Sequence, residues 1–175
     1  MFSRNKKNLT QHRSRLLRLA NSWCADPMLA DDLVQEALEK AVKHAHQLKD
    51  QDKLEPWLLR ILHNCLMAYL RSKRPSADID EVEVAHQESP DRDYGRQEIA
   101  DRVRLAVGKL PVGQRQVVTL VDLEDCSYSE VADALNIPIG TVMSRLSRAR
   151  QSLKQSLLQF KGATSEPGSN IRRIK

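Results

Sequence analysis

Two stretches of helical periodicity, separated by the sequence Asn-Ile-Pro at 136–138, constrain this chain more than any other feature. Ser127 and Glu130 have the spacing of a capping box, which predicts that a helix begins there. Asn136 tolerates the left-handed conformation that ends a helix, and Pro138 prevents the first helix from continuing while it suits the start of another. Residues 127–153 therefore predict a helix-turn-helix whose second helix begins near position 139 or 140.

The second of these helices has a face of hydroxyl and guanidinium side chains, with no carboxylate between residues 139 and 154. Such side chains suit phosphates and guanine edges in a DNA major groove. An ordinary solvated helix of a bundle is the alternative, although acidic and basic residues usually mix on such a helix. We predict that this helix contacts DNA and that Arg145, which is nearer its start than Arg148, lies closer to the bases.

Charge is distributed unevenly along the 175 residues, whose net charge is +5 with a pI near 9.2. Residues 1–75 contain 14 Lys and Arg against 8 Asp and Glu, whereas residues 76–94 contain 1 against 7. Basic segments on both sides of an acidic joint favour a polyanionic partner. Because the acidic stretch also lacks a sustained apolar pattern, we interpret it as a flexible linker.

Helical periodicity accounts for most of the remaining chain. It predicts helices over 9–24, 27–46 with Asp26 as N-cap, 54–74, 90–109 and 117–123, and the polar stretch 47–53 is predicted to be a loop. The predicted fold class is therefore all-α, with two small helical domains joined by a flexible acidic linker. The predicted boundaries are 1–75 for the first domain, 76–89 for the linker, 90–160 for the domain with the helix-turn-helix, and 161–175 for a disordered basic tail.

Other classes of protein are disfavoured by what the sequence lacks. Cys24, Cys65 and Cys126 are widely spaced and form no CxxC pair, which indicates a reducing compartment and a cytoplasmic protein. No apolar run of secretory or transmembrane length is present, so no membrane insertion is expected. We find no nucleophile-base pair, phosphate-binding loop or metal-ligand spacing, and we expect no enzymatic activity, no metal and no cofactor.

Three stretches together resemble a known family. They are ADDLVQEALEKA at 30–41, WLLRILHNCLMAYLRSKR at 57–74 and LPVGQRQVVTLVDLEDCSYSEVADALNIPIGTVMSRLSRAR at 110–150. The chain resembles a bacterial RNA polymerase sigma factor of the extracytoplasmic-function group, over almost its whole length from about Leu9 to Phe160. The stretches are similar to the core-polymerase-binding motif, the promoter-melting helix and region 4 of that family.

The resemblance implies roles for particular residues. The helix 54–74 would grip the minus-10 element, and the loop 48–53 would capture a base flipped out of the non-template strand. The residues implied to face core polymerase are Asp31, Asp32, Gln35 and Glu36. The residues expected at the minus-10 element are Asn64, Arg71, Lys73 and Arg74, with Arg60 and His63 extending the same cationic patch up the helix. The residues expected at the minus-35 element are Thr141, Ser144, Arg145 and Arg148.

The resemblance also implies partners, namely core RNA polymerase (through its β′ clamp helices and β flap), promoter DNA and an anti-sigma factor. The sequence departs from the family pattern at His63 and Ala68, where arginine and aspartate are common, and at Val42, where an aromatic residue is common. One alternative is a sigma-like decoy that binds an anti-sigma factor without binding DNA, although the basic faces expected of a DNA binder are present. A dimeric helix-turn-helix repressor would leave the 30–41 motif unexplained.

Overall fold

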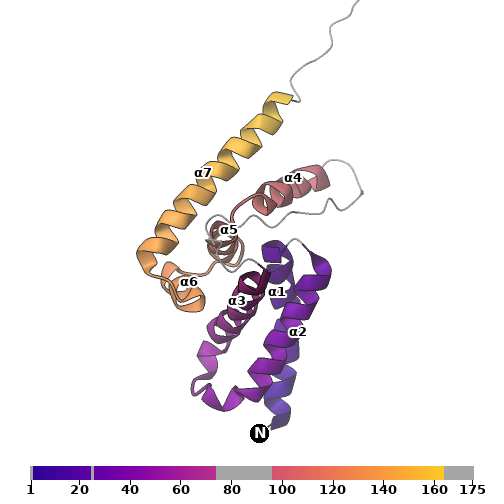
Figure 1. Ribbon diagram of the computed structural model, residues 1–175, viewed down its shortest axis with the longest axis vertical. Coiled ribbons are helices and arrows are strands. Elements are labelled where there is room, and N and C mark those ends of the chain that lie inside the picture. The colour runs from indigo at the N-terminus through magenta and orange to yellow at the C-terminus, as the bar shows by residue number, and fades with distance from the viewer. Residues whose placement is uncertain (1, 25, 74–95, 164–175) are drawn as a thin grey trace, which may run out of the picture.

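The computed structural model describes residues 2–24, 26–73 and 96–163, and every regular element in these ranges is a helix (Figure 1). The predicted linker 76–89 lies outside the described residues, as do residues 164–175 of the predicted tail. The described elements are α1 (Phe2–Cys24), α2 (Pro27–Lys43), η1 (Ala45–Gln47), η2 (Gln51–Lys53), α3 (Leu54–Lys73), α4 (Arg96–Gly108), α5 (Val112–Val118), η3 (Thr119–Leu123), α6 (Tyr128–Leu135) and α7 (Ile139–Ala163).

The N-terminal half is a bundle of α1, α2 and α3 around an apolar core. Asp26 caps α2, because its Oδ1 accepts hydrogen bonds from the amides of Met28 at 2.9 Å and Leu29 at 3.2 Å. The predicted start of this helix is confirmed, whereas its end at Lys43 comes three residues before the predicted 46. The predicted loop 47–53 contains the end of η1 and the whole of η2, and α3 then begins at Leu54 as predicted.

The C-terminal half differs from prediction where a single helix was expected over 117–123. The α-helix α5 ends at Val118, and the next five residues form a π-helical turn, η3. The hydroxyl of Thr119 donates to backbone carbonyls of the preceding turn, those of Arg115 at 2.8 Å and Gln116 at 3.0 Å. A threonine that bonds to the preceding turn disturbs the regular helical ladder, and the Glu124 amide instead reaches Thr119 O at 3.1 Å.

The end of α7 also differs from prediction, because the helix continues to Ala163 and so includes the first three residues of the predicted tail. At the start of the half, α4 is described from Arg96, and the predicted helical residues 90–95 lie outside the described ranges. The described residues thus include helices from both of the helical domains that the sequence predicts. No helix within the described ranges combines the length and the hydropathy that a membrane crossing requires.

The two halves pack against each other and share one continuous apolar core. In Figure 1, α5 lies at the centre of the molecule, between the bundle of α1 to α3 and the long helix α7. All seven residues of α5 are buried, which requires cover on more than one side of the helix. That cover comes from α7 in its own half and from α1 in the other half, while α6 packs on α3.

Candidate nucleic-acid interface

The helix-turn-helix consists of α6 and α7, and local hydrogen bonds define the start of α6 and the turn. Ser127 Oγ accepts from the Glu130 amide at 3.3 Å and the Ser127 amide donates to the Glu130 carboxylate at 2.8 Å, so the predicted capping box is confirmed. Hydrogen bonds from the Ser127 side chain and amide lower the pKa of Glu130. Asn136 takes the left-handed conformation (φ 52°, ψ 49°), which ends α6, and α7 begins at Ile139 as predicted.

The two faces of α7 have opposite character. Val142, Leu146 and Ala149 are buried, and α7 packs on α5 and α6. On the outer face the hydroxyl of Ser144 donates to the Thr141 carbonyl at 3.1 Å. Of the residues predicted to meet the minus-35 element, Ser144 and Arg148 are exposed, Thr141 is half-buried and Arg145 is buried.

Arg145 is only 8% exposed, although the sequence predicted it to be the residue closer to the bases. Its charge acts on His63 of α3, on the other half of the chain, and contributes to lowering the pKa of that imidazole. Arg145 is therefore turned away from solvent and lies near enough to α3 for its charge to act on His63. In this arrangement Arg148, and not Arg145, presents a guanidinium on the outer surface of the helix.

A second basic surface lies on α3. Arg60, Asn64, Arg71 and Lys73 are exposed, and Arg74 lies outside the described residues. Arg60, Asn64 and Arg71 are spaced by four and seven residues, so they share one face of the helix. The ammonium of Lys73 lies 5.8 Å from the ring centre of Tyr69, close enough for a cation-π interaction. Arg60, Asn64 and Arg71 thus form a strip along one side of α3, and Lys73, two residues after Arg71, lies on the opposite side of the helix.

The acidic residues of α2 form a third surface. Asp32, Gln35 and Glu36 are exposed and Asp31 is half-buried. Asp31 accepts a hydrogen bond from Arg13 of α1, and Glu36 pairs with Lys40 at 2.7 Å one turn along the helix. Exposed pairs of this kind contribute little to folding, so the carboxylates of this surface remain available for an external partner.

Comparison with known proteins assigns the chain to a family. Residues 9–75 match the family Sigma-70 region 2, and residues 98–153 match the family Sigma-70, region 4. The chain is also 31% identical to the RNA polymerase sigma-H factor of Pseudomonas aeruginosa over 159 residues, which cover 84% of this chain and 82% of that protein. The chain is a sigma factor of the extracytoplasmic-function group. Region 2 thus contains α1 to α3, and region 4 contains α4 to α7.

Other relatives of this sigma factor agree in sequence and in fold. The ECF RNA polymerase sigma-E factor of Escherichia coli K12 is 32% identical over 134 residues, 70% of each chain. The sigma factor RpoE from Bartonella quintana, solved with the anti-sigma factor NepR, superposes with a TM-score of 0.73 at 29% identity, covering 87% of this chain and 96% of that one. CnrH, solved with the cytosolic domain of CnrY, gives a TM-score of 0.62 at 26% identity, covering 88% and 87% of the two chains.

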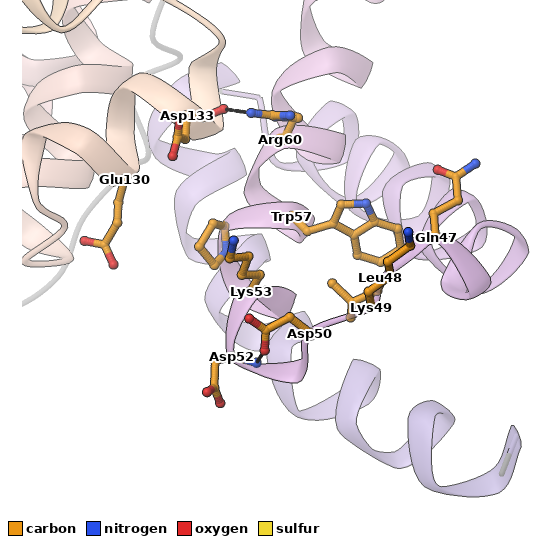
Figure 2. Close-up of a pocket in the computed structure, with 11 residues that line it drawn as sticks. Gln47, Leu48, Lys49, Asp50, Asp52, Lys53, Trp57, Arg60, Glu130 and Asp133 are labelled. Carbon is orange, nitrogen blue, oxygen red and sulfur yellow. Dashed lines mark hydrogen bonds between the residues drawn. The ribbon is translucent and has the colours of Figure 1, made fainter.

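A cavity of about 630 Å³ lies where region 2 meets region 4 (Figure 2). One side is formed by the loop 47–53 and the start of α3, including Trp57 and Arg60. The other side is formed by Glu130 and Asp133 of α6, and Figure 2 shows the hydrogen bond from Arg60 to the Asp133 carbonyl, which is 2.9 Å from Nε. The loop expected to capture a flipped base therefore lies across this cavity from Glu130 and Asp133 of region 4.

His63 occupies the contact between the two regions. It is 9% exposed, and its Nδ1 lies 3.1 Å from Nε2 of Gln116 in α5. Burial, followed by the nearby charges of Arg145 and Arg71, lowers the pKa of His63 to about 4, so the imidazole is neutral at pH 7. The sequence identified His63 as a departure from the family pattern and as an extension of the cationic patch. The second interpretation is wrong, because the imidazole is buried and its pKa is lowered to about 4.

Three further residues join the two regions, and sequence reasoning did not identify them as functional. Trp23 Nε1 donates to Thr119 Oγ1 at 2.8 Å. The fully buried guanidinium of Arg115 donates to the Trp23 carbonyl at 2.8 Å and to the carbonyls of Gly108 and Leu110. The sequence did hold a sign of these residues, because the polar Gln114, Arg115, Gln116 and Thr119 stand inside an otherwise apolar stretch.

Within the described part of the chain, no three His, Cys, Asp or Glu side chains are grouped as metal ligands would be.

Proposed function

We propose that this sigma factor binds core RNA polymerase, recognises minus-35 and minus-10 promoter elements, and promotes DNA melting for transcription initiation. The observation that carries the proposal is the presence of both sigma-70 regions on one chain together with an exposed basic recognition helix. Melting would be driven by capture of unstacked bases, which needs a pocket and a basic track rather than acid-base chemistry. The protein would act in the cytoplasm, where its polymerase and DNA partners are present.

The polymerase contact is proposed for α2. The exposed carboxylates of Asp32 and Glu36, together with Gln35, would pair with cationic side chains of the β′ clamp helices. Asp31 would join them by exchanging its pair with Arg13 for one with the polymerase. Region 4 would contact the β flap while its recognition helix lies on DNA. Burial of charge pairs at such an interface favours one orientation of the partner.

The promoter contacts are proposed for α3 and α7. The strip of Arg60, Asn64 and Arg71, extended by Lys73 and Arg74, would follow the DNA at the minus-10 element, where the cavity beside loop 47–53 offers space for an extruded base. Ser144 and Arg148, with Thr141 and Arg145, would meet the minus-35 element in the major groove.

Control by an anti-sigma factor is proposed as well. Both solved relatives described above were determined in complex with such a factor or with the cytosolic domain of a partner protein, and both resemble this chain over most of its length. That likeness supports a partner of the same kind here.

Transcription with purified core polymerase on a genomic fragment library tests the proposed function. We expect promoter-dependent transcripts that are absent with core polymerase alone, and an Arg148→Ala variant should reduce them. Lys154→Ala is the matched control, because it removes one exposed positive charge further along the same helix. Loss of a base contact by Arg148→Ala costs about 1 to 3 kcal/mol and relaxes preference at one position. Absence of any specific transcript would contradict the proposal, and equal effects of the two variants would contradict the role of Arg148.

A further inference from the structure

The recognition helix α7 exposes a large apolar side chain within the turns that are proposed to meet DNA. Met143 is 55% exposed, and Ile139, one turn earlier, is also exposed. Single apolar side chains are common on protein surfaces, so exposure alone gives Met143 no role. Its position is more informative, because the N-terminal residues of a recognition helix are those that contact base edges.

Met143 lies beside the outward-facing strip of α7. Successive residues are about 100° apart around an α-helix, so Gly140 and Ser144 lie opposite the buried Val142 and Met143 lies on one flank of that strip. Arg148 lies on the other flank, about 140° from Met143. A Cβ added to Gly140 would meet no atom within 4 Å beyond its chain neighbours and its own helix backbone. The surface beside Met143 is therefore open to the edge of a base.

The polar side chains near Met143 favour a particular base pair. Ser144 Oγ donates to the Thr141 carbonyl at 3.1 Å, so toward DNA this hydroxyl can only accept a hydrogen bond. In the major groove the amino groups of adenine and cytosine donate, and only an A·T pair combines such a donor with a methyl group. Arg148 Nε donates to the Ser144 carbonyl at 3.4 Å, which holds this cation over the same turn.

We propose that Met143 reads a thymine of the minus-35 element through contact between its side chain and the C5-methyl group in the major groove. The unbranched thioether chain of methionine adapts to the shape of such a group, and the contact removes apolar area of both partners from water. This inference deepens the proposed function and rests on it for the identity of the DNA element. It adds a determinant of sequence preference that involves no charge.

Replacement of thymine by uracil tests the contact, because it removes the methyl group and leaves the hydrogen-bonding groups of the base pair in place. The probe is a short duplex that carries the minus-35 element selected by the transcription experiment, with each thymine replaced in turn by deoxyuridine. We expect one replacement to weaken binding by the unmodified chain about fourfold, as the loss of one buried methyl group requires. Met143→Ala should bind the thymine duplex more weakly, and its affinities for the two duplexes should differ by less than about twofold.

Leu158→Ala is the matched control. Leu158 is 56% exposed on the same helix, but it lies about 22 Å further along the helix axis, away from the turns proposed to meet DNA. This variant should keep both the affinity and the preference for thymine. Met143→Leu restores an apolar side chain and should also keep the preference. Because both positions are exposed, neither alanine substitution should change urea unfolding by more than about 0.5 kcal/mol.

Two outcomes would overturn the role of Met143 directly. One is equal affinity of the unmodified chain for the thymine duplex and for every uracil form. The other is a Met143→Ala variant that loses affinity equally for both duplexes, since the side chain would then contact sugar, phosphate or protein. Selection of an element without thymine on either strand would also contradict the inference.

Arg148→Ala separates failure of this inference from failure of the proposed function. It should weaken binding of the thymine and uracil duplexes alike. If Arg148→Ala weakens binding while no uracil replacement does, the proposed function stands and the role of Met143 fails. If the unmodified chain binds the selected duplex no more tightly than a scrambled duplex, the proposed function fails and the inference fails with it.

Discussion

His63 should make the stability of this protein sensitive to mild acid. Its imidazole is buried between α3 and α5, accepts a hydrogen bond from the side-chain amide of Gln116, and lies near the positive charges of Arg145 and Arg71. Burial, followed by those charges, lowers the pKa from 6.5 to about 4 in the folded protein. The unfolded chain has the ordinary value, so the two states bind protons differently between these pH limits.

The sign and size of the effect follow from that difference. Above pH 6.5 the imidazole is neutral in both states, and His63 contributes its full stability. As pH falls from 6.5 toward about 4, the unfolded chain holds a proton that the folded chain does not, so the free energy of unfolding decreases. The pKa changes by about 2.5 units at about 1.4 kcal/mol each, so the full loss is about 3.5 kcal/mol, of which about 3 kcal/mol is reached at pH 4.

Urea unfolding of the unmodified chain and of His63→Gln, measured from pH 7.5 to 4, isolates this contribution. Other groups titrate in the same range, and comparison with the glutamine variant removes their effect because they are common to both proteins. We expect the difference in unfolding free energy between the two proteins to change by about 3 kcal/mol as pH falls. A difference that stays constant with pH would refute the burial of His63 at this interface.

Three further outcomes are expected. Asp32→Ala combined with Glu36→Ala should weaken binding to core polymerase in a pull-down titration while helical content by circular dichroism stays the same, because exposed charges contribute little to folding; unchanged affinity would count against α2 as the polymerase site. Arg115→Met should lower the free energy of unfolding, measured by urea titration, by about 3 to 5 kcal/mol, because three backbone carbonyls lose a charged donor. A loss below about 1 kcal/mol would contradict the hydrogen bonds described for Arg115. Thiol labelling of the native protein should reach Cys126 before Cys24, because Cys24 is buried and that burial raises its pKa to about 12. Faster labelling of Cys24 would argue against the packing of α1.

Local features of the fold could be predicted from the sequence because their causes are local. The capping box of Ser127 and Glu130, the left-handed Asn136 and the N-cap Asp26 each act within one helical turn, and each is found where the sequence placed it. The apolar stripe of α7 was also visible, since periodicity alone identifies a buried face. The all-α class and the helix-turn-helix followed from these signals.

The contact between the halves could not be predicted in the same way, because it joins residues far apart in the chain. Trp23 and Thr119 are 96 positions apart, and Arg60 and Asp133 are 73 positions apart. Nothing in the periodicity of α3 distinguishes a basic residue that faces solvent from one that binds a distant carbonyl. The π-helical turn at η3 was missed for a related reason, since the hydroxyl of Thr119 serves both its own helix and the other half of the chain.

Arg145 and Arg148, both proposed to contact DNA, differ in their surroundings on α7. Three residues correspond to a separation of about 60° around the helix axis, so both arginines can belong to one basic face. Arg145 is nevertheless three residues after the buried Val142 and four before the buried Ala149, whereas Arg148 is four residues after the exposed Ser144. Arg145 thus lies at the edge of the apolar stripe and is only 8% exposed. Arg148 is exposed and can meet a phosphate, whereas Arg145 is buried, so Arg148→Ala should lower the salt dependence of DNA binding more than Arg145→Ala does.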